Sequence, residues 1–112
     1  MRKDRVASVL AREISLILEH ELKDPRVDFL TVTGVDVSPD LKQARIYFTS
    51  LGDKAGDLKI LQHARGYIRS LLARRVRLRA VPEIEFMIDN SYEERTKIDA
   101  LFRKIGKDNQ EQ

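Results

Sequence analysis

The spacing of the apolar residues changes from a helical period to a strand period and back along the chain, and this order restricts the folds available to it. A helix is predicted over about residues 2–23, because apolar side chains recur at intervals of three and four: Val6, Leu10, Ile14, Ile17 and Leu18. We expect Asp24-Pro25 to end this helix, since a proline disfavours helical geometry in the residue before it.

Two segments with alternating side chains follow and predict a β-hairpin. In the first, over residues 29–37, the alternation assigns Leu30 and Val32 to one face and Thr31, Thr33 and Val35 to the other. In the second, the inward side chains are expected to be Ala44, Ile46 and Phe48. The turn between the two strands is predicted at Ser38-Pro39-Asp40, where proline fixes φ and the polar side chains bond the local backbone.

A longer helical stretch is predicted from about Asp57 to Arg79. Its middle contains Gly66, and a glycine weakens a helix interior by ~1 kcal/mol relative to alanine. We therefore expect a kink or break at Ala64-Arg65-Gly66. Val81-Pro82 is expected to stop the helical stretch before the next element.

The last part of the chain predicts a third strand and a final helix. The strand places on one face Ile84, Phe86 and Ile88. A capping box of Ser91 with Glu94 predicts the start of the helix, and Gly106 is a candidate for its C-cap. The apolar stripe of this helix contains Ile98, Leu101, Phe102 and Ile105.

Together these elements predict a small α+β domain with the order α-β-β-α-kink-α-β-α and a three-stranded sheet covered on one face by helices. A chain of 112 residues has the size of one compact domain. We assign residues 1–106 to this domain and residues 107–112 to a flexible polar tail.

Composition excludes several classes of function. The chain has no cysteine, which rules out disulfides, thiolate nucleophiles and thiolate metal sites. No apolar run approaches the ~18 residues of a membrane span, and the first residues contain no apolar signal-peptide region. We expect a soluble, cytoplasmic protein without membrane contact.

No residue pattern predicts catalysis, a cofactor or a small-molecule substrate. His20 and Asp24 have the spacing to touch one metal ion, but two ligands at a helix end do not make a site. His63 has no acidic residue between Leu58 and Pro82 to orient it as a general base. We therefore predict no catalytic residues and no metal site.

Charge is distributed unevenly, and this is the strongest functional signal in the sequence. The net charge of +3 combines 21 basic with 18 acidic residues. Between Leu58 and Pro82 there is no acidic residue, and we call this stretch the basic segment. It contains seven cations: Lys59, Arg65, Arg69, Arg74, Arg75, Arg77 and Arg79.

A solvated helix face usually mixes both signs of charge, so seven cations without an anion indicate a phosphate-rich partner. Arginine is suited to bidentate phosphate contact. We take all seven cations as candidate RNA-binding residues. Tyr67 is the only aromatic residue in the basic segment, which argues against a platform of several stacking rings. The alternative is a small adaptor that docks the basic segment on an acidic protein surface.

Several short motifs, in their order and spacing, resemble the bacterial ribosome-binding factor A family from Arg5 to Ile105. They are Arg5-Val6, Asp24-Pro25-Arg26, Thr31-Val32-Thr33-Gly34-Val35, Val37-Ser38-Pro39-Asp40-Leu41, Ala44-Arg45-Ile46-Tyr47, Ala64-Arg65-Gly66, Ile68-Arg69, Arg77-Leu78-Arg79, Pro82-Glu83-Ile84-Glu85-Phe86 and Asp89-Asn90-Ser91. The resemblance implies a KH-like domain of the second type, in which an Ala-x-Gly kink replaces the Gly-x-x-Gly loop. Ala64 and Gly66 stand at the kink.

The resemblance also implies a function. Members of the family are non-enzymatic assembly factors that bind the free 30S small ribosomal subunit, not the complete 70S ribosome. They assist late maturation and processing of 16S rRNA. The implied protein is a monomer without a cofactor. On this basis we expect Gly66→Val to damage both kink and binding, and glutamate at Arg69 and Arg75 to weaken binding while the fold stays intact.

Overall fold

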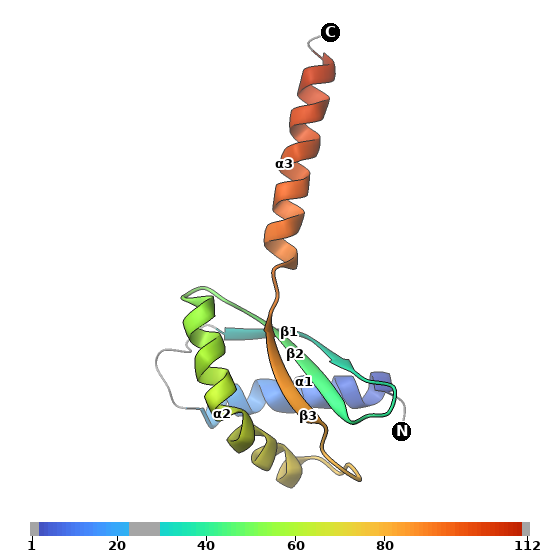
Figure 1. The fold of residues 1–112 in the computed structure, drawn as a ribbon, viewed down its shortest axis with the longest axis vertical. Coiled ribbons are helices and arrows are strands. Elements are labelled where there is room, and N and C mark those ends of the chain that lie inside the picture. Colours follow the sequence, from blue (N-terminus) through green and yellow to red (C-terminus); the bar gives the residue numbers. More distant parts are fainter. Residues whose placement is uncertain (1–2, 23–29, 111–112) are drawn as a thin grey trace.

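The computed structural model describes residues 3–22 and 30–110 and contains six elements. Their order is α1 (Lys3–His20), β1 (Leu30–Val37), β2 (Gln43–Ser50), α2 (Lys54–Arg75), β3 (Glu83–Ile88) and α3 (Ser91–Gln110) (Figure 1). The expected helix end at Asp24-Pro25 lies outside the described residues. No helix in the described ranges is long and apolar enough to span a membrane.

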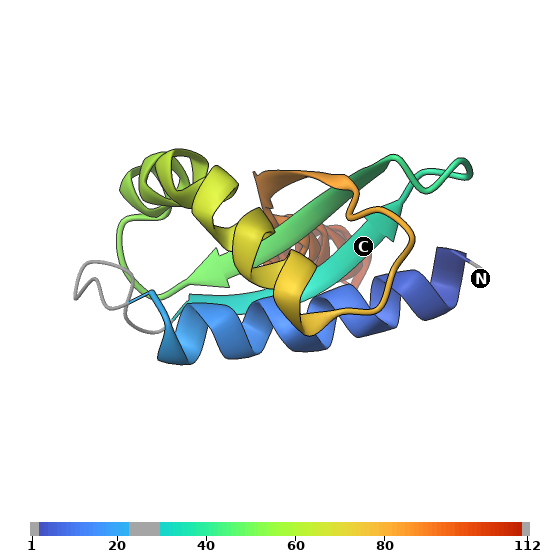
Figure 2. The same ribbon diagram turned by 90° about the horizontal axis from the view of Figure 1, so that it is seen from below.

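The three strands form one sheet in the order β1-β2-β3. β1 runs antiparallel to β2, whereas β3 is parallel to β2 and is reached through α2 as a crossover. Helices α1 and α2 cover the same face of the sheet (Figure 2). The predicted α+β class, the three-stranded sheet and the placement of these two helices are confirmed.

The buried side chains of α1, α2 and the sheet form a single core. It consists of Val6, Leu10, Ile14, Ile17, Val37, Ala44, Ile46, Phe48, Leu61, Ile68, Leu72, Val76, Ile84 and Phe86. The helical stripe predicted for α1 and the alternation predicted for β2 and β3 supply most of these residues. Full burial of each large aliphatic or aromatic side chain contributes about 1.5–3 kcal/mol, so this core fixes α2 firmly on the sheet.

One face assignment in β1 is wrong. The register of β1 on β2 shifts between Val32 and Gly34, so Thr33 is an extra residue in the strand. Such a bulge reverses the alternation after it. Val35 therefore packs against the core, although simple alternation places it on the face of Thr31.

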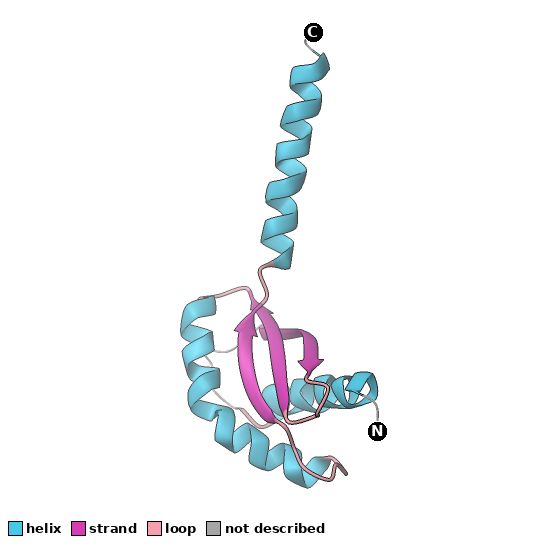
Figure 3. Ribbon diagram, turned by 45° about the vertical axis from the view of Figure 1, so that its right-hand side comes forward, coloured by secondary structure: helices cyan, strands magenta, loops and turns pink. Residues whose placement is uncertain are grey.

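Helix α2 is one continuous element, and the expected break at residues 64–66 is absent. Asp53 caps its start by accepting a hydrogen bond from the N–H of Gly56 at 3.1 Å. The ribbon of α2 changes direction along its length (Figure 3). That this bend is centred on Ala64 and Gly66 stays a prediction, and the observed order of elements is α-β-β-α-β-α.

The helix also ends earlier than predicted, at Arg75 instead of Arg79. Val76 has extended geometry with φ −110° and ψ 144°, and its side chain is buried in the core. Because the core takes up Val76, the chain leaves the helix there. Arg77 and Arg79 consequently lie in the loop between α2 and β3.

Helix α3 projects away from the domain (Figure 1), giving the molecule extents of 63 × 35 × 17 Å. Its start differs from the predicted capping box, since the carboxylate of Asp89 accepts the N–H of Ser91 at 2.9 Å. The helix continues past Gly106 to Gln110, so Gly106 does not end it. Its apolar stripe lies on the surface instead of in the core: Ile98, Leu101, Phe102 and Ile105.

Candidate nucleic-acid interface

The seven candidate cations occupy two neighbouring elements of the structure. Five lie on α2: Lys59, Arg65, Arg69, Arg74 and Arg75. Arg77 and Arg79 follow in the loop that leads to β3. The side chains are not equivalent, because the described part of the protein holds two of them by polar contacts and leaves the other five without such contacts.

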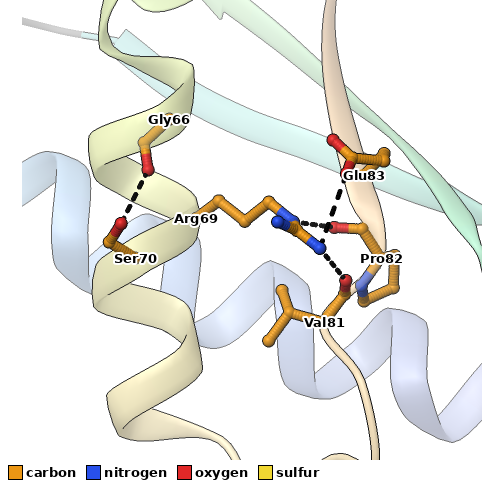
Figure 4. A network of polar contacts seen from close by, with 6 residues as sticks. All are labelled: Gly66, Arg69, Ser70, Val81, Pro82 and Glu83. Carbon is orange, nitrogen blue, oxygen red and sulfur yellow. Dashed lines mark hydrogen bonds and ion pairs between the residues drawn. The ribbon is translucent and has the colours of Figure 1, made fainter.

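Arg69 joins α2 to the residues that precede β3 (Figure 4). Its Nη2 donates to the carbonyl oxygen of Val81 at 2.8 Å, and its Nε donates to that of Pro82 at 3.2 Å. The same Nη2 lies 3.5 Å from a carboxylate oxygen of Glu83. The side chain of Arg69 thus donates hydrogen bonds to two main-chain carbonyls of the loop. Arg69 therefore has a structural role in addition to any role in binding.

Arg75 joins the end of α2 to α1. Its Nε donates to Oε2 of Glu13 at 2.8 Å, and both side chains are partly shielded from solvent. A pair in this position is less screened than one on the open surface. Of the two arginines in the last turn of α2, Arg75 is therefore neutralised within the domain and Arg74 is not.

The remaining five cations are exposed and form no ion pair with any carboxylate in the described part of the chain. They are Lys59, Arg65, Arg74, Arg77 and Arg79. We call them the free cations. Because none of the five is neutralised by a paired carboxylate, we take them as the candidate phosphate-binding residues. Carboxylates nevertheless line the same hollows: Asp36, Glu83 and Glu85 beside Arg65, and Asp40 and Glu83 beside Arg77 and Arg79.

A hollow runs along α2 beside the loop that precedes β3. Arg65 and Arg69 line it, together with the small residues Gly66, Ser70 and Ala73. Ser70 donates its hydroxyl to the carbonyl oxygen of Gly66 at 3.1 Å, so the hydroxyl is directed back to the helix (Figure 4). The hollow thus combines arginines and small helix residues with one acidic residue, Glu83, whose carboxylate contacts Arg69.

A second hollow brings in a cation that lies outside the basic segment. Lys42, in the loop between β1 and β2, lines the same hollow as Arg77 and Arg79. The parallel pairing of β2 and β3 places it there, because the N–H of Glu83 donates to the carbonyl oxygen of Lys42 at 2.9 Å. Sequence reasoning missed Lys42, and only the strand order reveals this proximity.

The loop that carries Lys42 is held by its own side chains. The hydroxyl of Ser38 donates to Asp40 at 2.7 Å, and the N–H of Lys42 donates to the same oxygen at 3.1 Å. These hydrogen bonds keep the pKa of Asp40 below its ordinary value. Leu41 has a φ of 62°, a backbone angle that residues other than glycine rarely adopt. The loop therefore presents Lys42 from a well-defined backbone.

The two histidines lie on different helices. His63 is exposed on α2, and Nε2 of His20 lies 3.9 Å from a carboxylate oxygen of Glu19 at the end of α1. Asp24, the other residue of the weak metal pattern, lies outside the described residues. Among the described side chains no group of three or more metal-ligating residues comes together.

Comparison with known proteins identifies the class. The family model described as ribosome-binding factor A matches residues 2–102 of this chain. The chain belongs to the ribosome-binding factor A family.

Solved structures agree with this assignment. The chain resembles the crystal structure of ribosome-binding factor A from Thermus thermophilus, with 32% identity and a TM-score of 0.73 over 79% of this chain and 97% of that one. A Thermotoga maritima protein described as a putative ribosome binding factor A, solved by solution NMR, matches with 32% identity and a TM-score of 0.67 over 76% and 84%.

A third structure shows a relative together with its partner. It is a homology model of Thermus thermophilus RbfA fitted into the cryo-EM map of a 30S-RbfA complex. This chain matches it with 32% identity and a TM-score of 0.67, covering 75% of this chain and 91% of that one.

Proposed function

We propose that this protein is a ribosome assembly factor that binds the free 30S small ribosomal subunit and assists late maturation and processing of 16S rRNA. The observation that carries the proposal is the set of five free cations on α2 and the following loop. The 30S complex of the Thermus relative supports the choice of partner. A factor with this partner acts in the cytoplasm, as a monomer and without a cofactor.

The free cations supply the phosphate contacts in this account. Arg65, Arg74, Arg77 and Arg79 each offer a planar fork that matches two phosphate oxygens, whereas Lys59 contributes a single point of charge. These contacts position RNA on the domain without reading its bases. The core and the Arg69 contacts keep α2 and the loop in a fixed relation, so the RNA segments they touch are held in one arrangement.

Such binding alters the populations of RNA conformations and makes or breaks no covalent bond. A factor that binds one arrangement of maturing RNA more tightly than others shifts the equilibrium toward it by the difference in binding free energy. We infer that the complete 70S ribosome binds less well, because its RNA has already left that arrangement. Processing of 16S rRNA would then be carried out by other proteins on the RNA so positioned.

The salt dependence of binding tests the phosphate contacts. We expect the affinity for purified 30S subunits to fall steeply with salt, by a log–log slope of about −0.7 to −0.9 for each phosphate contacted. The triple variant Arg74→Gln, Arg77→Gln and Arg79→Gln should bind more weakly and with a flatter slope. A matched control replaces three exposed arginines outside the basic segment, Arg12, Arg95 and Arg103, and should retain both affinity and slope.

Adding competitors to the same titration distinguishes RNA binding from the alternative, an adaptor that docks on an acidic protein. Free 16S rRNA should compete with 30S subunits for the protein if the free cations bind phosphates. An acidic protein partner predicts instead that polyglutamate competes at least as well as 16S rRNA at equal charge. Equal losses in the triple variant and its control would contradict the proposed surface.

A further inference from the structure

Tyr67 is an exposed aromatic residue at the centre of the basic segment. It lies on α2 with 53% of its surface accessible, although large apolar side chains of this helix such as Leu61 and Ile68 are fully buried. Its hydroxyl makes no hydrogen bond to any residue in the described ranges. Tyr67 therefore contributes neither to the core nor to the polar contacts that hold α2.

The face of α2 that carries Tyr67 has one cation about two turns away on each side of the ring. Residues three or four apart share one face of a helix, and this rule aligns Lys59, His63, Tyr67, Ser70 and Arg74. All five are exposed. Lys59 and Arg74 lie about 12 Å and about 10 Å from Tyr67 along the helix axis. Their long side chains can reach back toward the ring, and both belong to the free cations.

The helix surface is open at Gly66, the residue that precedes Tyr67. Apart from its chain neighbours and the backbone of its own helix, a Cβ added at Gly66 would meet no atom within 4 Å, and Gly66 does not have a positive φ. Neither a close side-chain contact nor a positive φ requires a glycine there, although glycine is less favourable than alanine inside a helix. The open position continues into the hollow that Arg65 and Arg69 line. The hollow reaches the face of Tyr67 at Ser70, which lies three residues further along the helix, so a strand of RNA that contacts the ring can continue into the hollow there.

We infer that Tyr67 stacks on one unpaired base of the bound RNA, with Lys59 and Arg74 holding the phosphates on either side of it. The inference rests on the proposed function and names the kind of RNA at that surface. Bases inside a duplex are already stacked on one another and leave no face for a side chain. The preferred ligand is therefore an RNA helix interrupted by an unpaired nucleotide, not a continuous duplex.

A pair of labelled RNA hairpins tests this inference by fluorescence anisotropy. One hairpin carries a single bulged adenosine in its stem, and the other has a fully paired stem with the same number of phosphates. The wild-type protein should bind the bulged hairpin more tightly. Tyr67→Leu should weaken binding to the bulged hairpin by about 5- to 100-fold and leave the paired hairpin unchanged. Tyr67→Phe, which keeps the ring, should retain the preference.

Arg74→Gln provides the contrast, because loss of a phosphate contact should weaken binding to both hairpins alike. Circular dichroism checks that each variant is folded, and the exposure of Tyr67 makes Tyr67→Leu a mild change. Wild-type protein that binds both hairpins equally, or Tyr67→Leu that keeps the preference, overturns the stacking inference alone. Wild-type protein that binds neither hairpin nor 30S subunits overturns the proposed function with it.

Discussion

The guanidinium of Arg69 holds the end of the α2–β3 loop by donating from Nη2 to the carbonyl oxygen of Val81, 2.8 Å away. A second hydrogen bond from Nε reaches the adjacent Pro82. These contacts change the expectation that Arg69 can be replaced without cost to the fold. A glutamate at this position would face two carbonyl oxygens and Glu83, all of which repel a negative charge.

We predict that Arg69→Ala lowers the free energy of unfolding by about 1–2 kcal/mol, because two charge-assisted hydrogen bonds to a partly exposed loop are lost. Arg74→Ala, at an exposed position with no ion pair among the described residues, should change stability by less than about 0.5 kcal/mol. Urea unfolding followed by circular dichroism measures both. Equal stabilities of the two variants would show that the Arg69 contacts do not support the loop.

Arg75 and Glu13 should be energetically coupled. Their side chains meet at 2.8 Å between the end of α2 and α1, and each is partly shielded from solvent. We expect a double-mutant cycle of Arg75→Met and Glu13→Gln to give a coupling free energy of about 0.5–1 kcal/mol. The coupling should weaken in high salt. A coupling of zero at low salt would contradict the contact.

The start of α3 should make stability depend on pH. Hydrogen bonds from Ser91 and Thr33 keep the pKa of Asp89 below its ordinary value of 3.8. A lowered pKa in the folded state stabilises the protein above the unfolded pKa, and this contribution disappears as the pH falls through the folded pKa. Ser91→Ala removes the hydroxyl donor and should raise the pKa of Asp89 toward 3.8.

The variant should therefore be less stable than wild type at neutral pH, and the difference should vanish in acid. Carboxyl NMR titration and unfolding between about pH 2 and about pH 7 measure the two effects. Ser8→Ala is the control, because the hydroxyl of Ser8 donates to the main-chain carbonyl of Asp4 and contacts no carboxylate among the described residues. A difference that persists at the lowest pH would assign the loss to something other than Asp89.

We expect the substitution Gly66→Ala to increase the stability of the protein and to weaken its binding to 30S subunits. Because a Cβ meets open space there, Gly66→Ala should raise the free energy of unfolding by about 0.5–1 kcal/mol. The added methyl group would occupy the surface on which we place the RNA, so binding to 30S subunits should weaken. The added Cβ does not test the two γ-methyl groups of valine, so the damage expected from Gly66→Val to the bend and to binding stays a prediction. A loss of stability in Gly66→Ala would show that the bend of α2 needs the glycine.

Hydrophobic periodicity was sufficient to predict the class of fold. The stripe of α1 and the alternation in β2 and β3 follow the geometry of single elements, and each was predicted from local sequence. The bulge at Thr33 was not, because it depends on how β1 pairs with β2. The end of α2 depends in the same way on where the core takes up Val76.

The charge pattern predicted the region of the candidate site but not the role of each residue. A run of cations without acidic neighbours in sequence says nothing about neighbours in space. Glu13 and Glu83 come from α1 and β3, and they reach Arg75 and Arg69 only after the chain folds. Lys42 joins the surface through the pairing of β2 with β3. Distinguishing free from engaged cations therefore required the tertiary structure.

The central claim is that the protein binds the small ribosomal subunit through its free cations, and sedimentation tests it most directly. The protein is mixed at low salt with purified 30S subunits and, separately, with complete 70S ribosomes, and the pelleted fraction is measured. We predict that wild type pellets with 30S but not with 70S, and that the triple variant at Arg74, Arg77 and Arg79 stays in the supernatant. Equal pelleting of wild type and the triple variant with 30S, or no pelleting of wild type, would contradict the claim.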